Sequence, residues 1–185
     1  MDFSFFAVIA FFLLTDGGMF GFSAILACAL HETSHLIMMI IFAIPVDVIA
    51  FYGAGIRISS SRIQKAPRFR RNIVLLSGSM GNFIFAAVLF LFGEQLAALI
   101  NLFTGLFNLL PIGEYDGAAL LKGFAIRHFK AENVDLIMKI AGIASAAICV
   151  FLVIFFTRGF SLTLISTIVY MICAWCFKTI PLSRQ

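Results

Sequence analysis

Apolar runs of membrane-spanning length fill most of this chain and limit the folds open to it. Six can be marked out, the first and the fourth being short: Phe3 to Leu14, Phe20 to Ile44, Ile73 to Phe92, Leu96 to Leu110, Val134 to Phe156 and Phe160 to Phe177. A helix needs about 20 predominantly apolar residues to cross the hydrocarbon core of a bilayer. The chain is 62% hydrophobic and 12% charged, whereas soluble domains are nearer half apolar. We therefore predict an all-α polytopic membrane protein with about six transmembrane helices.

Basic residues are distributed very unevenly around these six spans. If the spans alternate in direction, all but one of the 13 lysine and arginine residues fall on the side of the two termini. Only Arg158 lies on the other side. Because cytoplasmic segments carry an excess of Lys and Arg, both termini are predicted to be cytoplasmic. This topology also accounts for the basic run from Arg62 to Arg71, so we expect no nucleic-acid partner.

The lengths of the termini predict a single membrane-embedded domain over residues 1–185. No basic residue precedes the first apolar run, which favours a retained span over a cleaved signal. After the sixth run only Lys178 to Gln185 remain. We therefore expect no added soluble domain.

The second run contains five consecutive polar residues, HETSH, from His31 to His35. On a helix the two histidines lie one turn apart on one face, so both imidazoles could bind one zinc ion with Glu32 beside them. In zinc hydrolases this H-E-x-x-H arrangement acidifies a bound water, and the carboxylate accepts its proton as the water attacks a carbonyl. The alternative is a polar seam between helices, but each ionisable group in hydrocarbon costs about 2–3 kcal/mol. We favour a metal site.

A catalytic zinc site needs a third protein ligand beyond these two histidines. His128 lies in the basic loop that follows the fourth run and is expected to be solvated. Asp116, in the stretch NLLPIGEYDG, ends the polar fourth run and is flanked by a proline and two glycines. Such residues let a membrane segment unwind and turn a side chain inward. An ordinary turn at the membrane edge is the alternative for Asp116 and Gly117.

These residues resemble the motifs of the site-2 proteases, zinc metalloproteases that cut within the membrane. The family pattern is H-E-x-x-H on one span and, much later, N-x-x-P with an Asp-Gly. The matching positions are His31, Glu32, His35, Asn108, Pro111, Asp116 and Gly117. The resemblance implies that Zn2+ is held by His31, His35 and Asp116. It covers a motif-bearing core of about residues 20–121, leaving the two further runs, 134–156 and 160–177, without a motif.

A further family motif, small-Gly-Pro-x-x-Asn on the third span, is matched in part by SGSMGN. Gly78 and Asn82 agree with it, and Ser79 replaces the proline. Asn82 and Asn108 have two interpretations. Either they are interhelical hydrogen-bond donors, or, as the resemblance implies, they orient substrate near the metal.

Two other positions depart from the family pattern near the expected third ligand. Glu114 stands where a second proline is common, and Ala118 stands where a second glycine often follows the Asp-Gly. Both affect the local backbone rather than the chemistry. Glu114 could also compete as a ligand or act as a proton relay.

The stretch from Pro45 to Ser61 shows strand-like alternation after a Gly-Ala-Gly turn. It predicts a short β-hairpin at the cytoplasmic mouth of the site, with a plain loop as the alternative. The edge of such a hairpin could pair with an extended substrate. A helical peptide hides its carbonyls in its own hydrogen bonds and must unwind before it can be cut.

The predicted function is that of an intramembrane zinc metalloprotease with Glu32 as catalytic base. Its substrate would be a transmembrane or membrane-proximal segment of another membrane protein. The compact form resembles the bacterial branch that includes the sporulation processing protease, which releases a membrane-tethered transcription factor. That resemblance implies a bacterial cytoplasmic membrane and a regulatory membrane partner.

Two other functions stay open. A metal transporter could use the same histidines, although the other spans show no ladder of His, Asp or Glu. A non-catalytic membrane scaffold is the second, although Glu32 and the expected ligands are all present.

Overall fold

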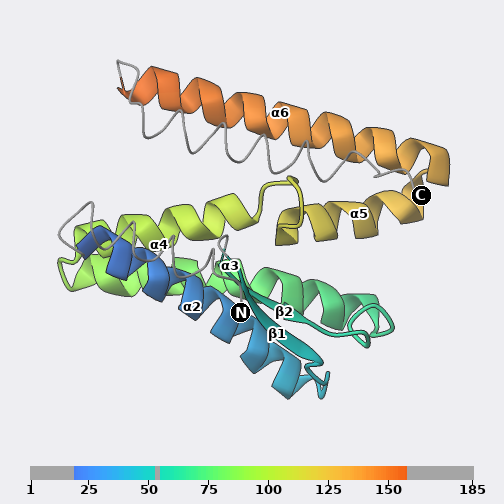
Figure 1. Ribbon diagram of the computed structural model, residues 1–185, viewed down its shortest axis with the longest axis horizontal. Coiled ribbons are helices and arrows are strands. Elements are labelled where there is room, and N and C mark those ends of the chain that lie inside the picture. The colour runs from blue at the N-terminus through green and yellow to red at the C-terminus, as the bar shows by residue number, and fades with distance from the viewer. Residues whose placement is uncertain (1–18, 53–54, 158–185) are drawn as a thin grey trace. The chain divides into compact units, whose positions relative to one another are not determined.

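The computed structural model describes residues 19–52 and 55–157 (Figure 1). Within these ranges the chain forms five helices and two strands. They are α2 (Met19–Ile41), β1 (Val48–Tyr52), β2 (Gly55–Ser59), α3 (Arg68–Leu91), α4 (Gln95–Asn108), α5 (Asp116–His128) and α6 (Ala131–Thr157). The predicted first and sixth spans, 3–14 and 160–177, lie outside the described residues. The chain divides into two compact units, Met1–Leu109 and Leu110–Gln185, and a single domain stays a prediction.

Three helices of the first unit correspond to apolar runs of the sequence. In the described part of the chain, α2 and α3 are long and apolar enough to cross a membrane, and α4 is a shorter apolar helix. Large apolar side chains on these helices face outward, among them Ile40, Phe85 and Leu91. An apolar exterior of this kind suits contact with lipid. The helical fold class and association with a membrane are thus supported, and the number of spans stays a prediction.

Helix α3 packs against both α2 and α4, which also contact each other (Figure 1). Glycines permit these close approaches. A Cβ at Gly81 would collide with Ser34 of α2, and a Cβ at Gly105 of α4 would lie 2.5 Å from the ring of Phe83. In lipid, helices associate through close packing of small residues rather than through the hydrophobic effect. The glycines therefore hold α2 and α4 close to α3.

Helix α2 ends three residues before the apolar run does. The Ile44 N–H donates to the carbonyl of Met39 at 2.8 Å, and the Ala43 N–H donates to Ile40 at 3.0 Å. Ala43 has a positive φ of 53°. This is a Schellman ending, in which a left-handed residue closes the last turn. Ile44 then packs with Met39 and Val74 in a buried apolar cluster that joins the end of α2 to α3.

Strands β1 and β2 pair antiparallel, from Val48 with Ser59 to Tyr52 with Gly55, within the stretch where the sequence predicted a hairpin. Strand β2 contacts α2. At the open end of the pair, the Asp47 carboxylate accepts a hydrogen bond from the Ser61 N–H at 2.6 Å. Hydrogen bonding to Ser61 lowers the pKa of Asp47. The segments flanking the two strands are therefore joined at their base.

The second unit contains α5 and α6, which contact each other. The sequence predicted a basic loop here, but residues 116–128 form a helix. Asp116 lies in its first turn, and Arg127 and His128 lie in its last. Acidic residues at the start and basic residues at the end complement the helix dipole. The His128 side chain is exposed, as predicted.

Candidate metal centre

Helix α2 places His31 and His35 one turn apart on a single buried face. Their side chains are 4% and 8% exposed. The rings meet edge to face with centroids 4.7 Å apart, and the two Nε2 atoms lie 3.1 Å from each other. The helical spacing of HETSH therefore brings one nitrogen of each imidazole to a common point.

The other nitrogen of each imidazole faces an oxygen of α3. Nδ1 of His31 lies 2.8 Å from Oδ1 of Asn82. Nδ1 of His35 lies 2.6 Å from the carbonyl oxygen of Val74, which also accepts a hydrogen bond from the Ser77 hydroxyl at 2.7 Å. A carbonyl oxygen can only accept, so each Nδ1 carries the proton.

These anchors fix the chemistry of the two nitrogens that face each other. A neutral imidazole protonated at Nδ1 has a lone pair at Nε2, and histidine ligands of metals are oriented by such hydrogen bonds from the other ring nitrogen. Two nitrogens bound to one tetrahedral zinc at about 2.0–2.1 Å lie about 3.3 Å apart. The 3.1 Å separation of the two Nε2 atoms is close to this value. The residues present therefore fit a zinc ion.

Gly78 of α3 lies directly against the histidine pair. A Cβ built at this position would lie 2.6 Å from both Cε1 and Nε2 of His31, and closer still to Nε2 of His35. Any larger residue would therefore fill the space beside the two ligand nitrogens. Steric space beside the two histidines therefore requires a glycine at position 78 of the SGSMGN motif.

Asn82 connects the histidine pair to two other helices. Its Nδ2 donates to the carbonyl of Ala27 in α2 at 3.0 Å and to Oδ1 of Asn101 in α4 at 3.1 Å. The Asn101 amide donates in turn to the carbonyl of Ala97 at 2.9 Å. The sequence marked Asn82 as a site residue but not Asn101, whose only signal was a polar residue inside an apolar run. Asn82 therefore makes interhelical hydrogen bonds and lies beside His31, and a role in orienting substrate stays a prediction.

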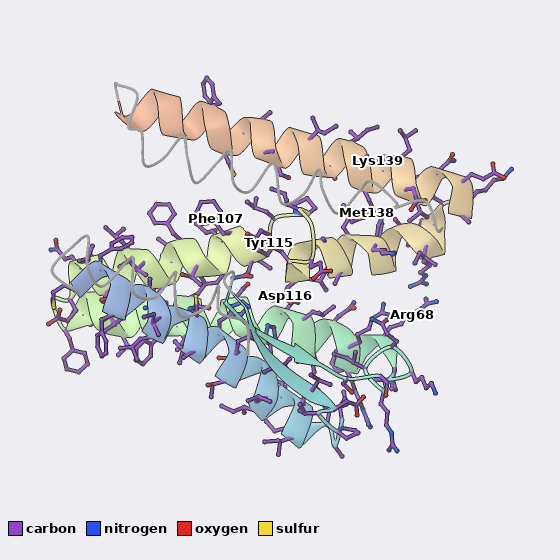
Figure 2. The ribbon with its side chains drawn as sticks, viewed as in Figure 1. Arg68, Phe107, Tyr115, Asp116, Met138 and Lys139 are labelled. Carbon is purple, nitrogen blue, oxygen red and sulfur yellow. The ribbon has the colours of Figure 1, made fainter. Side chains whose placement is uncertain are left out.

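Asp116 begins α5 in the second unit, preceded by Tyr115 (Figure 2). Its side chain is half-buried, whereas Glu114 is exposed. A turn at Gly113, with φ of +56°, leads into this helix. His31 and His35 in the first unit each offer one ring nitrogen as a metal ligand, and Asp116 in the second unit offers one carboxylate oxygen.

Comparison with known proteins finds a likeness among solved structures. No family model matches the chain, and no curated protein matches its sequence. Among solved structures, the site-2 protease from Methanocaldococcus jannaschii is similar with a TM-score of 0.66, covering 98% of this chain and 88% of that chain at 17% identity. The chain has the fold of a site-2 protease. The resemblance drawn from the sequence motifs is thus confirmed at the level of the fold, and the activity rests on the site itself.

The other predicted site residues take distinct places in this site-2 protease fold. Glu32 follows His31 on α2 and is half-buried. Asn108, at the last turn of α4, donates its Nδ2 hydrogen to the carbonyl of Thr104 on its own helix at 2.9 Å. The structure therefore brings His31, His35 and Asn82 together within the first unit. The catalytic and substrate roles of Glu32 and Asn108 stay predictions.

Proposed function

We propose that this protein is an intramembrane zinc metalloprotease of the site-2 type. The observation that carries the proposal is the buried histidine pair. Both imidazoles hold their Nδ1 hydrogens against oxygens of α3 and direct their Nε2 lone pairs to a common point, 3.1 Å apart. The site-2 protease fold supports the same conclusion.

In this proposal His31, His35 and Asp116 hold Zn2+, and each residue has a defined task. Bound zinc supplies a Lewis acid that polarises a carbonyl and makes water a stronger acid. Glu32 accepts the proton of the attacking water and delivers it to the leaving amine. Asn82 fixes the orientation of His31, and Asn108 orients the substrate backbone.

The proposed substrate is a transmembrane or membrane-proximal segment of another membrane protein. The enzyme would be a multi-pass protein of a bacterial cytoplasmic membrane with both termini in the cytoplasm. A helical substrate must unwind before its carbonyls become accessible, and an edge of the β1–β2 hairpin would pair with the extended segment. Cleavage would release a transcription or signalling factor, under the control of a membrane partner.

Metal content is the first test. We expect elemental analysis of detergent-purified protein to find about one zinc per chain. The Asp116→Ala variant should lose zinc, whereas Glu114→Ala, a nearby carboxylate change, should retain it. Loss with Glu114→Ala instead would assign the third ligand to Glu114. Wild-type protein without metal would refute the metalloprotease proposal and favour a scaffold.

Proteolysis is the second test. Membranes from cells that make the wild-type protein should contain new N-termini inside apolar segments of other proteins. Membranes with Glu32→Gln should lack them while the purified variant keeps its zinc, because glutamine cannot accept the proton. If both proteins bind zinc and the two membrane samples contain the same N-termini, the protease proposal is refuted and the metal-transport alternative is favoured.

A further inference from the structure

We propose that Asn101 of α4 is a positioning residue for the metal centre, acting through Asn82 to set the tautomer of His31. Asn101 touches neither histidine in the contacts described above. The inference rests on the proposed metal site and adds a residue on a third helix to it. Its consequence is that α4 controls the metal affinity of a ligand on α2.

The contacts form a continuous relay across three helices. The Asn101 amide donates to the Ala97 carbonyl at 2.9 Å, and its Oδ1 accepts a hydrogen bond from Nδ2 of Asn82 at 3.1 Å. Oδ1 of Asn82 then accepts from Nδ1 of His31 at 2.8 Å. Asn82 is fully buried and Asn101 is 3% exposed. Each step is therefore shielded from bulk water, which could otherwise replace a missing partner.

The direction of each amide follows from its partners. Nδ2 of Asn82 faces two acceptors, the Ala27 carbonyl and Oδ1 of Asn101. If the Asn82 amide were reversed, its oxygen would face those two acceptors and its NH2 group would face Nδ1 of His31. His31 would then have to accept at Nδ1 and carry its proton at Nε2, which abolishes the lone pair needed for a metal.

Asn101 supplies one of the two contacts that oppose this reversal. Its own orientation is set by a backbone carbonyl, Ala97, which can only accept and therefore requires the NH2 group on that side. Without Asn101, Asn82 keeps only the Ala27 carbonyl to distinguish its two orientations. We expect both Asn82 orientations, and hence both His31 tautomers, to be populated.

The two ligands are anchored in different ways, which provides an internal control. His35 is held by the backbone carbonyl of Val74, which no side-chain change in α4 removes. His31 is held by a side-chain amide that depends on Asn101. Disturbing the relay should therefore alter His31 alone.

The test uses full-length, detergent-purified protein and four variants. Asn101→Leu removes the acceptor while keeping a similar side-chain volume, and Asn82→Leu removes the intermediate amide. The double variant combines them. Thr104→Val is the matched control, because the Thr104 hydroxyl donates to the carbonyl of Ile100 on its own helix at 2.8 Å and takes no part in the relay.

Two readouts follow the relay directly. Zinc affinity is measured by competition with a chelator, and the imidazole tautomers of the metal-free protein are read from 15N chemical shifts near pH 8. The chain has only three histidines, so their signals can be assigned by single substitutions. The melting temperature of the metal-free protein shows whether a variant is merely less well folded.

We expect Asn101→Leu to weaken zinc binding about tenfold, at the lower end of the 10–100-fold typical of residues that orient a ligand. His31 should shift toward the Nε2–H tautomer while His35 stays unchanged. Thr104→Val should bind zinc like the wild type. In the Asn82→Leu background, Asn101→Leu should cause no further loss, because the relay is already broken.

Three results would overturn the inference. Wild-type affinity with an unchanged His31 tautomer in Asn101→Leu would show that α4 does not set the ligand. If Asn101→Leu weakened zinc binding in the Asn82→Leu background as much as in the wild type, Asn101 would act on zinc binding by a route other than Asn82. If wild-type protein binds no zinc, this inference and the proposed function fail together, whereas the first two results leave the proposed function intact.

Discussion

Replacing Gly78 with alanine should disable the metal centre without removing any polar group. The added methyl would lie 2.6 Å from Cε1 and Nε2 of His31 and closer to Nε2 of His35. Favourable contacts between carbon-sized atoms begin at about 3.5 Å. The methyl and the His31 ring must therefore separate by about 0.9 Å, the difference between these two distances, and the His35 ring must move further.

A displacement of this size exceeds what the site tolerates. Functional groups must be held within about 0.5 Å of their working geometry, and a misplacement of about 1 Å can cost a factor of about 100. We therefore expect Gly78→Ala to weaken zinc binding about 100-fold and to reduce proteolysis at least as much. The overpacking should also lower the free energy of unfolding by about 1–3 kcal/mol.

Gly81→Ala is the matched control for this experiment. It lies on the same helix and the same α2 interface, but its methyl would meet Ser34 rather than a histidine. Both variants should show a lower melting temperature without metal, and only Gly78→Ala should show the large loss of zinc affinity in chelator competition. Wild-type affinity in Gly78→Ala, or equal losses in both variants, would refute the steric reasoning.

Four other substitutions test the fold around the site. Ala43→Gly should raise the free energy of unfolding by about 0.5–1 kcal/mol, because a left-handed conformation costs an alanine about 1–2 kcal/mol. Gly93 has a positive φ just after α3, so Gly93→Ala should lower the free energy of unfolding. Denaturant unfolding measures both changes. The buried Ser79 hydroxyl has no hydrogen-bond partner among the described residues, so Ser79→Ala should raise the free energy of unfolding by about 1 kcal/mol. A lower melting temperature in this variant would contradict the prediction. Hydrogen bonding to Ser61 favours the ionised form of Asp47 over the protonated form and so lowers its pKa. Its stabilisation should be fully present above the unfolded pKa of about 3.9 and be lost as the pH falls from there through the lowered pKa of the folded state. The difference in melting temperature between the wild type and Asp47→Asn should vanish once the folded-state carboxyl is protonated. A difference that persists at that low pH would count against the hydrogen bond between Asp47 and Ser61.

The features that sequence reasoning predicted well depend on local periodicity. HETSH placed on a helix must bring His31 and His35 to one face, because residues four apart are neighbours on a helix. The apolar runs likewise predicted α2, α3 and α4 within a few residues. These predictions needed no knowledge of which helix packs against which.

The features it missed depend on tertiary contacts. Nothing in the sequence distinguishes Asn101 from another polar residue in an apolar run, since its partner Asn82 lies on a different helix. The carbonyl of Val74 that holds His35 is invisible in a sequence because every residue has one. Helix packing alone turns these groups into supports for the ligands.

Sequence signals for helix ends also failed where a residue unusual for that position stood at the end of a helix. The end of α2 was placed at Ile44 because the left-handed residue of its Schellman ending is Ala43, where glycine would have marked the stop. Helix α5 was interpreted as part of a basic loop because no apolar run of membrane-spanning length covers it. Its first-turn acid and last-turn bases were signals for a helix that the basic composition obscured.

The same glycines that let the helices pack also determine the geometry of the proposed metal centre. In lipid, α2 and α3 can approach closely only where side chains are small, and Gly78 and Gly81 provide this against His35 and Ser34. Close approach is also what brings the Val74 carbonyl and the Asn82 amide within hydrogen-bond reach of the two imidazoles. The spacing of α2 and α3 therefore sets the tautomers of the two imidazoles. A change that separates these helices should weaken metal binding even when every ligand is retained.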